Sequence, residues 1–159
     1  VETGEFFVIG DKARSPPQVV RRFVAAGHAL GGHTSSHLVI PGRSRSNLAA
    51  DLGQCRQLLA DLSGRDTLLF RPPKGEMDLR SARDVAALGY RIVHWTRTYS
   101  DYQRDGLAPL LARMAAAPPQ PRDIVLLHDH NPYTIGALAQ AIPRWQAHGL
   151  GFATVEPAL

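Results

Sequence analysis

The sequence predicts an α/β protein in which parallel strands alternate with helices, as a sheet or a barrel. Along the 159 residues, short apolar runs alternate with amphipathic stretches whose apolar residues recur every three or four positions. About six strands with helices between them are typical of a parallel α/β architecture. The length of 159 residues also fits one globular domain, predicted to span residues 1–159.

The strand predictions rest on apolar runs that end at a turn residue or a polar residue. The first run ends at Gly10, and the run over 124–127 gives the strongest strand signal of the chain. The predicted strands span residues 6–9, 29–32, 67–70, 90–95, 124–127 and 151–155.

The helix predictions rest on apolar stripes with capping and stop residues at their ends. Ser15-Pro16 offers an N-cap and a first-turn proline for a first helix that stops at Gly27. Ser46 is the predicted N-cap of the longest helix, and Gly64 is its stop. The helices after the first are predicted over residues 47–62, 81–88, 107–116 and 134–147.

Composition limits the classes of partner. The net charge is +4, and most of the basic residues are arginines, which bind carboxylates and phosphates. Because the arginines are spread over many segments without interleaved aromatics, we predict a solvated basic surface and no nucleic-acid partner. No run approaches the roughly 18 apolar residues of a membrane span. The single cysteine, Cys55, excludes an intramolecular disulfide and is predicted to be a core residue of its helix.

Polar and aromatic residues recur where the predicted strands end. His33 and His37 follow the second strand, Arg71 the third, Trp95 the fourth and His128 the fifth. In α/β barrels the C-terminal ends of the strands form the active-site face, so residues from distant segments meet there. We therefore expect these side chains to converge.

His33 and His37 are candidate metal ligands. Four residues apart, their imidazoles lie on one face if the segment after the strand makes a helical turn, and two such nitrogens can bind one divalent ion. The alternative is a pair of ordinary polar loop histidines. Gly31-Gly32, directly before them, permits a backbone conformation that other residues resist.

Arg71 precedes a rigid turn formed by two prolines, which cannot donate main-chain hydrogen bonds. The next free N–H belongs to Lys74 and is presented to solvent or substrate. Arg71 could hold a carboxylate while the Lys74 N–H stabilises a developing oxyanion. The alternative is a proline turn beside a surface arginine.

His128 lies at the end of the most apolar strand. Histidine can act as a general acid at neutral pH when a carboxylate orients it and keeps it protonated. Asp101 is the candidate carboxylate, with the adjacent Asp129 as the alternative. A structural histidine is the other interpretation.

Together these segments resemble the polysaccharide deacetylase family, also called the NodB-homology or carbohydrate esterase 4 group. Five motifs occur in the family's order and spacing. Gly4–Gly10 is similar to A-T-F-F-V-I-G, Gly27–His37 to G-H-E-I-G-N-H-T-x-x-H, Phe70–Gly75 to F-R-P-P-Y-G, Trp95 with Asp101-Tyr102 to W-x5-D-W, and Ile124–Asp129 to I-x-L-x-H-D.

The resemblance implies a distorted (β/α) barrel and a bacterial, metal-dependent hydrolase. Its substrate would be an acetylated carbohydrate such as peptidoglycan or chitin-type N-acetylglucosamine, from which it would remove N-acetyl or O-acetyl groups. His33 and His37 would bind the divalent ion, usually zinc. The Lys74 N–H would stabilise the oxyanion. Export to the cell envelope is common in the family.

The remaining implied roles concern proton transfer and the acetyl pocket. His128, tuned by Asp101, would protonate the leaving amine, and Arg71 would orient the catalytic base. Leu126 and Trp95 would line the acetyl pocket, and Tyr102, which replaces the family's tryptophan, would keep an aromatic wall for the substrate.

One family motif, T-F-D-D-G, has no counterpart. It supplies the base and the third metal ligand, yet no Asp-Asp pair occurs in the 159 residues, and neither Glu2 nor Glu5 substitutes convincingly. A complete (β/α)8 barrel typically needs about 250 residues. We therefore predict a chain truncated at its N-terminus and impaired on its own. The alternatives are a carbohydrate-binding pseudoenzyme of the same fold and a basic domain that binds an anionic polymer.

Overall fold

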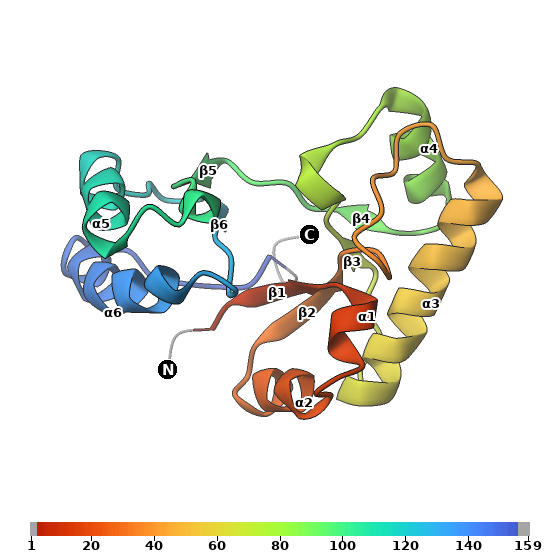
Figure 1. Cartoon of the computed structure of the whole chain (residues 1–159), viewed down its shortest axis with the longest axis horizontal. Coiled ribbons are helices and arrows are strands. Elements are labelled where there is room, and N and C mark those ends of the chain that lie inside the picture. The colour runs from red at the N-terminus through yellow and green to blue at the C-terminus, as the bar shows by residue number, and fades with distance from the viewer. Residues whose placement is uncertain (1–2, 156–159) are drawn as a thin grey trace. The chain divides into compact units, whose positions relative to one another are not determined.

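The computed structural model describes residues 3–155, so Glu2 lies outside the described residues. The chain divides into two compact units, and each is described by itself. The first unit comprises the chain up to His94 together with the segment from Phe152 onward, and the second comprises Trp95–Gly151. Figure 1 shows both units with their helices and strands labelled.

The first unit contains a parallel sheet in the order β1-β2-β3-β4 (Figure 1). Register pairs Phe7 of β1 with Gly31 of β2, and Gly32 of β2 with Phe70 of β3. The ends of β2 and β3 therefore lie side by side. The strands are β1 (Glu5–Val8), β2 (Ala29–Gly32), β3 (Leu69–Phe70) and β4 (Arg91–Ile92).

Four helices belong to this unit: α1 (Gly10–Ala13), α2 (Gln18–Ala25), α3 (Arg45–Ser63) and α4 (Leu79–Ala87). Two predicted caps are wrong. Helix α2 begins after Pro17, and α3 begins after Ser44, whose hydroxyl accepts from the Asn47 N–H at 3.2 Å. Ser46 falls inside the first turn of α3. The predicted stop is confirmed, because Gly64 has a left-handed φ of 70°.

Helix α3 contributes to both apolar clusters of the first unit. Leu48 and Leu52 pack in a cluster with Phe70, while Cys55 and Leu59 pack in another. Cys55 is 1% exposed, which confirms the prediction of a core residue, and burial raises the pKa of its thiol. The continuous stripe on α3 thus anchors the strands that carry the site.

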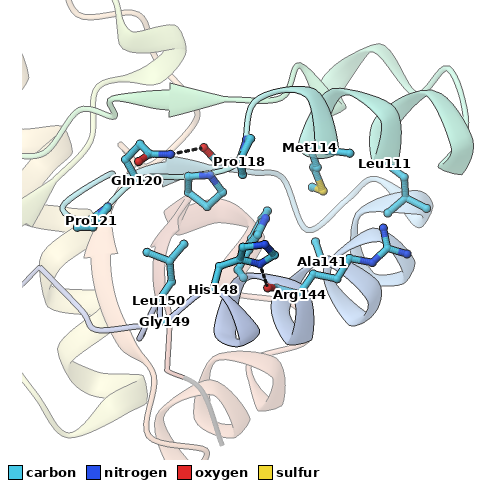
Figure 2. A pocket seen from close by; sticks show the side chains of 13 residues that line it. Leu111, Met114, Pro118, Gln120, Pro121, Ala141, Arg144, His148, Gly149 and Leu150 are labelled. Atoms are coloured by element: carbon cyan, nitrogen blue, oxygen red, sulfur yellow. Dashed lines mark hydrogen bonds between the residues drawn. The ribbon is translucent and has the colours of Figure 1, made fainter.

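The second unit pairs β5 (Arg97–Thr98) with β6 (Val125–Leu126) in parallel. Helix α5 (Leu107–Ala116) packs on α6 (Pro132–Ala147). A groove of about 510 Å³ lies between α5, the loop of residues 118–121, which contains three prolines, and the C-terminal end of α6 (Figure 2). Its lining is mainly apolar and includes Leu111, Met114 and Leu150, and it contains none of the predicted site residues.

Two strand predictions differ from the structure. Residues 151–155 form no strand. The Val155 N–H donates to the carboxylate of Glu5 at 3.3 Å, whereas in a sheet it would donate to a main-chain carbonyl of the neighbouring strand. Strand β5 was not predicted because its two residues are polar, and Arg97 is fixed by an ion pair with Asp123 at 2.6 Å. Six strands are nevertheless present within residues 3–155, and no helix there has both the length and the apolar composition to cross a membrane.

Candidate active site

His33 and His37 lie on the loop that follows β2. Their ring centroids are 5.0 Å apart, with His33 half-buried and His37 exposed. The helical turn that would place both rings on one face does not form, and Thr34 and His37 take left-handed φ values of 61° and 63°. The loop still brings both rings together.

Hydrogen bonds to two helices fix this loop. The Ser35 N–H donates to the Asp51 carboxylate of α3 at 2.9 Å, and the Ser35 hydroxyl donates to the Asp51 carbonyl at 3.0 Å. At the start of α1, the Gly10 N–H donates to the Thr34 carbonyl at 3.0 Å. The buried Thr34 hydroxyl accepts from the Leu38 N–H at 2.9 Å. The histidines are therefore presented by a tightly held segment.

The orientation of His33 is set by the neighbouring strand end. Its Nδ1 lies 2.7 Å from the Arg71 carbonyl oxygen, which can only accept, so Nδ1 carries the proton. Nε2 is then the nitrogen that can bind a metal, and a carbonyl partner of this kind is the usual support of a metal-ligating histidine.

Arg71 is buried, with 8% of its surface exposed. Its Nε donates to the Val93 carbonyl at 3.1 Å and its guanidinium to the His94 carbonyl at 3.2 Å. The guanidinium carbon lies 4.1 Å from the centre of the Phe7 ring. Burial lowers the pKa of Arg71 to about 10, a shift opposed by the charge of Glu5, so the side chain stays protonated at neutral pH.

Gly31 makes this packing possible. A Cβ on Gly31 would lie 2.5 Å from the Phe7 ring, whereas one on Gly32 would meet nothing closer than 3.7 Å. Neither glycine has a positive φ. The prediction that both serve backbone freedom is therefore wrong: Gly31 is needed for the close approach of Phe7, and the structure gives no such need for Gly32.

Lys74 lies in the turn η1 (Pro73–Gly75) with a left-handed φ of 57° and an exposed side chain. The main-chain hydrogen bonds of this turn are donated by Gly75 to Pro72 and by Glu76 to Pro73. In the part of the chain that the structure describes, the Lys74 N–H donates no such bond. It is thus available to a substrate oxygen.

The second unit brings Asp101 and His128 together. Asp101 begins the turn η2 (Asp101–Gln103) after β5, and His128 follows β6. One carboxylate oxygen lies 2.8 Å from His128 Nδ1, and the other accepts from the His128 N–H at 2.7 Å. Asp129 is exposed, so Asp101 is the carboxylate that orients the ring.

Asp101 is fully buried, at 0% exposure. Burial alone would raise its pKa, but hydrogen bonds from His128 and Thr134 outweigh that effect, and the pKa lies below its ordinary value. The carboxylate is therefore ionised at neutral pH and accepts only. His128 Nδ1 must donate to it, which leaves Nε2, on a side chain 31% exposed, for a reaction partner.

The predicted pocket residues have different surroundings. Leu126 on β6 pairs with Thr98 and is half-buried, as is Trp95, whereas Tyr102 is 58% exposed. The Tyr102 ring lies 6.2 Å from that of His128. The ring of His130, which the sequence did not assign, lies 5.3 Å from that of His128.

Sequence reasoning missed two supports of Asp101, namely Thr134 and Asn131. The Thr134 hydroxyl lies 2.8 Å from the carboxylate, and the Asn131 amide donates to the Asp101 carbonyl. The one available signal was the pairing of a potential N-cap asparagine with a threonine three residues later.

The metal-ligand set is small. Across residues 3–155, no group of three or more His, Cys, Asp or Glu side chains is arranged to hold a metal ion. His33 and His37 supply two imidazoles, a donor set that suits zinc and similar divalent ions.

Comparison with known proteins identifies the family. The family model described as polysaccharide deacetylase matches residues 3–93, more than half of the chain. The chain belongs to the polysaccharide deacetylase family. The parallel strands and helices, and the predicted NodB-type α/β fold, agree with this membership.

One curated relative of this deacetylase-family chain is a peptidoglycan-N-acetylglucosamine deacetylase from Bacillus cereus. It is 29% identical over 97% of this chain and 74% of its own length. The match covers 60% of the length of a peptidoglycan-N-acetylmuramic acid deacetylase from Bacillus subtilis and 58% of the length of a 30.6 kDa protein from Geobacillus stearothermophilus.

Two solved structures share the fold. A carbohydrate esterase family 4 pseudoenzyme from Bacillus anthracis has a TM-score of 0.89 at 20% identity, covering 97% of this chain and 54% of that one. A family 4 acetyl xylan esterase from Clostridium thermocellum, in complex with a cobalt ion, has a TM-score of 0.86 at 24% identity, covering 97% and 75%.

Proposed function

We propose that the chain is a metal-dependent carbohydrate deacetylase that removes N-acetyl or O-acetyl groups, with peptidoglycan or chitin-type N-acetylglucosamine as its substrate. The observation that carries this proposal is the pair of Asp101 and His128. A buried carboxylate that holds Nδ1–H leaves Nε2 as the nitrogen that would take up a second proton and pass it to the leaving amine. The relative from Bacillus cereus supports the substrate class.

The first unit would supply the electrophilic part of the reaction. His33 and His37 would hold a divalent ion, with zinc as the first choice; the cobalt ion in the acetyl xylan esterase supports a divalent metal. Such an ion, when bound, polarises a water and the acetyl carbonyl. The Lys74 N–H would donate to the developing oxyanion, and Arg71 would orient the catalytic base.

The second unit would supply the acid and the pocket. Asp101 would hold the His128 ring through Nδ1, and Nε2 would pass a proton to the leaving nitrogen. We assign Leu126, Trp95 and Tyr102 to the acetyl pocket and the sugar contact.

We infer that turnover by the 159-residue chain alone is weak. Catalytic zinc sites usually have three protein ligands, and residues 3–155 offer no cluster of that size. The pseudoenzyme from Bacillus anthracis favours the second candidate, a carbohydrate-binding protein without turnover.

The test measures acetate release from chitin oligomers and peptidoglycan fragments with added Zn²⁺ or Co²⁺. We expect slow release that a chelator abolishes. His128→Asn should lower it by about a hundredfold or more, the typical contribution of a general acid.

His148→Asn is the matched control, because His148 is exposed at the end of α6 and its Nδ1 contacts only the Arg144 carbonyl among the described hydrogen bonds. It should keep the parent activity. If the chain binds sugar but releases no acetate with any added metal, the second candidate, a carbohydrate-binding protein, is the correct function.

A further inference from the structure

We propose that Thr134 is a positioning residue, which holds the Asp101 carboxylate in the orientation that His128 needs. This inference rests on the proposed role of His128 as a general acid. It adds a residue on the first turn of α6 that acts through Asp101 and contacts no reacting atom.

The geometry assigns hydrogen-bond donors to both oxygens of the carboxylate. Oδ2 accepts from the Thr134 hydroxyl at 2.8 Å and from the His128 N–H at 2.7 Å. Oδ1 faces His128 Nδ1 at 2.8 Å. Because two donors hold Oδ2, the carboxylate cannot rotate about its Cβ–Cγ bond without losing both, and Oδ1 stays directed at the ring.

Burial makes the hydroxyl difficult to replace. Thr134 is 3% exposed and Asp101 is 0% exposed, so bulk water does not reach the shared hydrogen bond. A buried charged acceptor that loses one partner bears the desolvation penalty of that site. With only the His128 N–H left on Oδ2, the carboxylate is held less firmly against rotation, and Oδ1 is less strictly directed at His128 Nδ1.

Asn131 holds the main chain of the same residue. Its amide nitrogen donates to the Asp101 carbonyl, and its amide oxygen accepts from the Tyr133 N–H at 2.9 Å as the N-cap of α6. The first turn of α6 therefore binds Asp101 at both its carbonyl and its carboxylate. These two attachments hold the Thr134 hydroxyl at a fixed position relative to the Asp101 carboxylate.

The experiment compares Thr134→Val, which removes the hydroxyl at nearly constant volume, with Thr134→Ser, which keeps it. The first readout is the ¹⁵N chemical shift of the His128 ring nitrogens in metal-free protein at neutral pH. In the parent and in Thr134→Ser the neutral ring should carry its proton on Nδ1. In Thr134→Val a measurable fraction should move to the Nε2–H tautomer.

The second readout is acetate release. Thr134→Val should lower kcat by roughly ten- to one-hundredfold, as expected for loss of a hydrogen bond to a charged group, with KM within about twofold. Thr134→Ser should restore kcat. Thr67→Val is the matched control, since the Thr67 hydroxyl only accepts from the Leu69 N–H in the described bonds.

A parent-like tautomer in Thr134→Val, or a serine variant as altered as the valine variant, would overturn the inference. If Thr134→Val does not fold, Thr134→Ser and Thr134→Ala give the same comparison, since they differ by the hydroxyl alone. Absence of acetate release in the parent would reject the proposed function, while the tautomer would still decide the role of Thr134.

Discussion

The two units position their functional groups by different means. In the first unit, Arg71 is held by packing against Phe7 and by main-chain carbonyls, and His33 by another carbonyl. In the second, His128 is held by hydrogen bonds to the ionised carboxylate of Asp101, which also accepts from Thr134. Both units use the ends of adjacent parallel strands.

The difference shows how complete each arrangement is. Side chains of the second unit donate hydrogen bonds to both carboxylate oxygens of Asp101. The pair of Asp101 and His128 therefore has its hydrogen-bond partners among the described residues. The two imidazoles of the first unit need further ligands to hold a metal firmly. The acid pair of the proposed mechanism is thus complete within the second unit, whereas the proposed metal site of the first unit needs further ligands.

The largest effect expected is on metal binding. His37→Ala should lower the affinity for Co²⁺ by at least about a hundredfold, because removing a ligand exceeds the ten- to hundredfold loss of an outer-shell change. Cobalt absorption spectra and calorimetry would measure it, with His148→Ala as the control. If the two units position their groups independently, the ¹⁵N chemical shifts of the His128 ring stay unchanged in His37→Ala. A change in these shifts would contradict that independence.

Packing in the first unit is tested at Gly31. Gly31→Ala should lower the free energy of unfolding by about 1–3 kcal/mol, because the Phe7 ring has to move from a Cβ only 2.5 Å away. Gly32→Ala is the matched control, with no contact under 3.7 Å. Denaturant unfolding measures both, and equal losses would contradict the assigned role of Gly31.

Charge in the second unit is tested by pH. The folded pKa of Asp101 is depressed, so its contribution to stability is present above the unfolded value of about 3.9 and lost as pH falls through the folded value. We expect Asp101→Asn to be about 1–2 kcal/mol less stable than the parent at pH 6. The gap in unfolding free energy should narrow below about pH 4; a constant gap from pH 6 to pH 3 would speak against an ionised Asp101.

Much of the fold was predictable from periodicity. The strand 29–32 and the helix 107–116 agree residue by residue with β2 and α5, because the residue pattern along each segment is local information. Strand β5 and the absence of a strand over 151–155 depend on Arg97 with Asp123 and on Glu5 with Val155. Those contacts join residues far apart in sequence, which no local pattern contains.

The candidate site was predictable as residue types but not as geometry. Spacing and family resemblance selected Asp101 and His128, and the structure brings these two together. Thr134 was not selected, because nothing in a threonine's local sequence indicates that a carboxylate 33 residues earlier accepts its hydroxyl.

The loop that carries His33 and His37 has a thermodynamic consequence. Its left-handed residues and its bonds to Asp51 and Gly10 are formed when the first unit folds. The conformational entropy of the loop is therefore lost during folding, before any ion arrives. Because the Arg71 carbonyl already holds the His33 ring, the proposed metal binding would have to order only the exposed His37 ring, and association should proceed without a slow rearrangement of the chain.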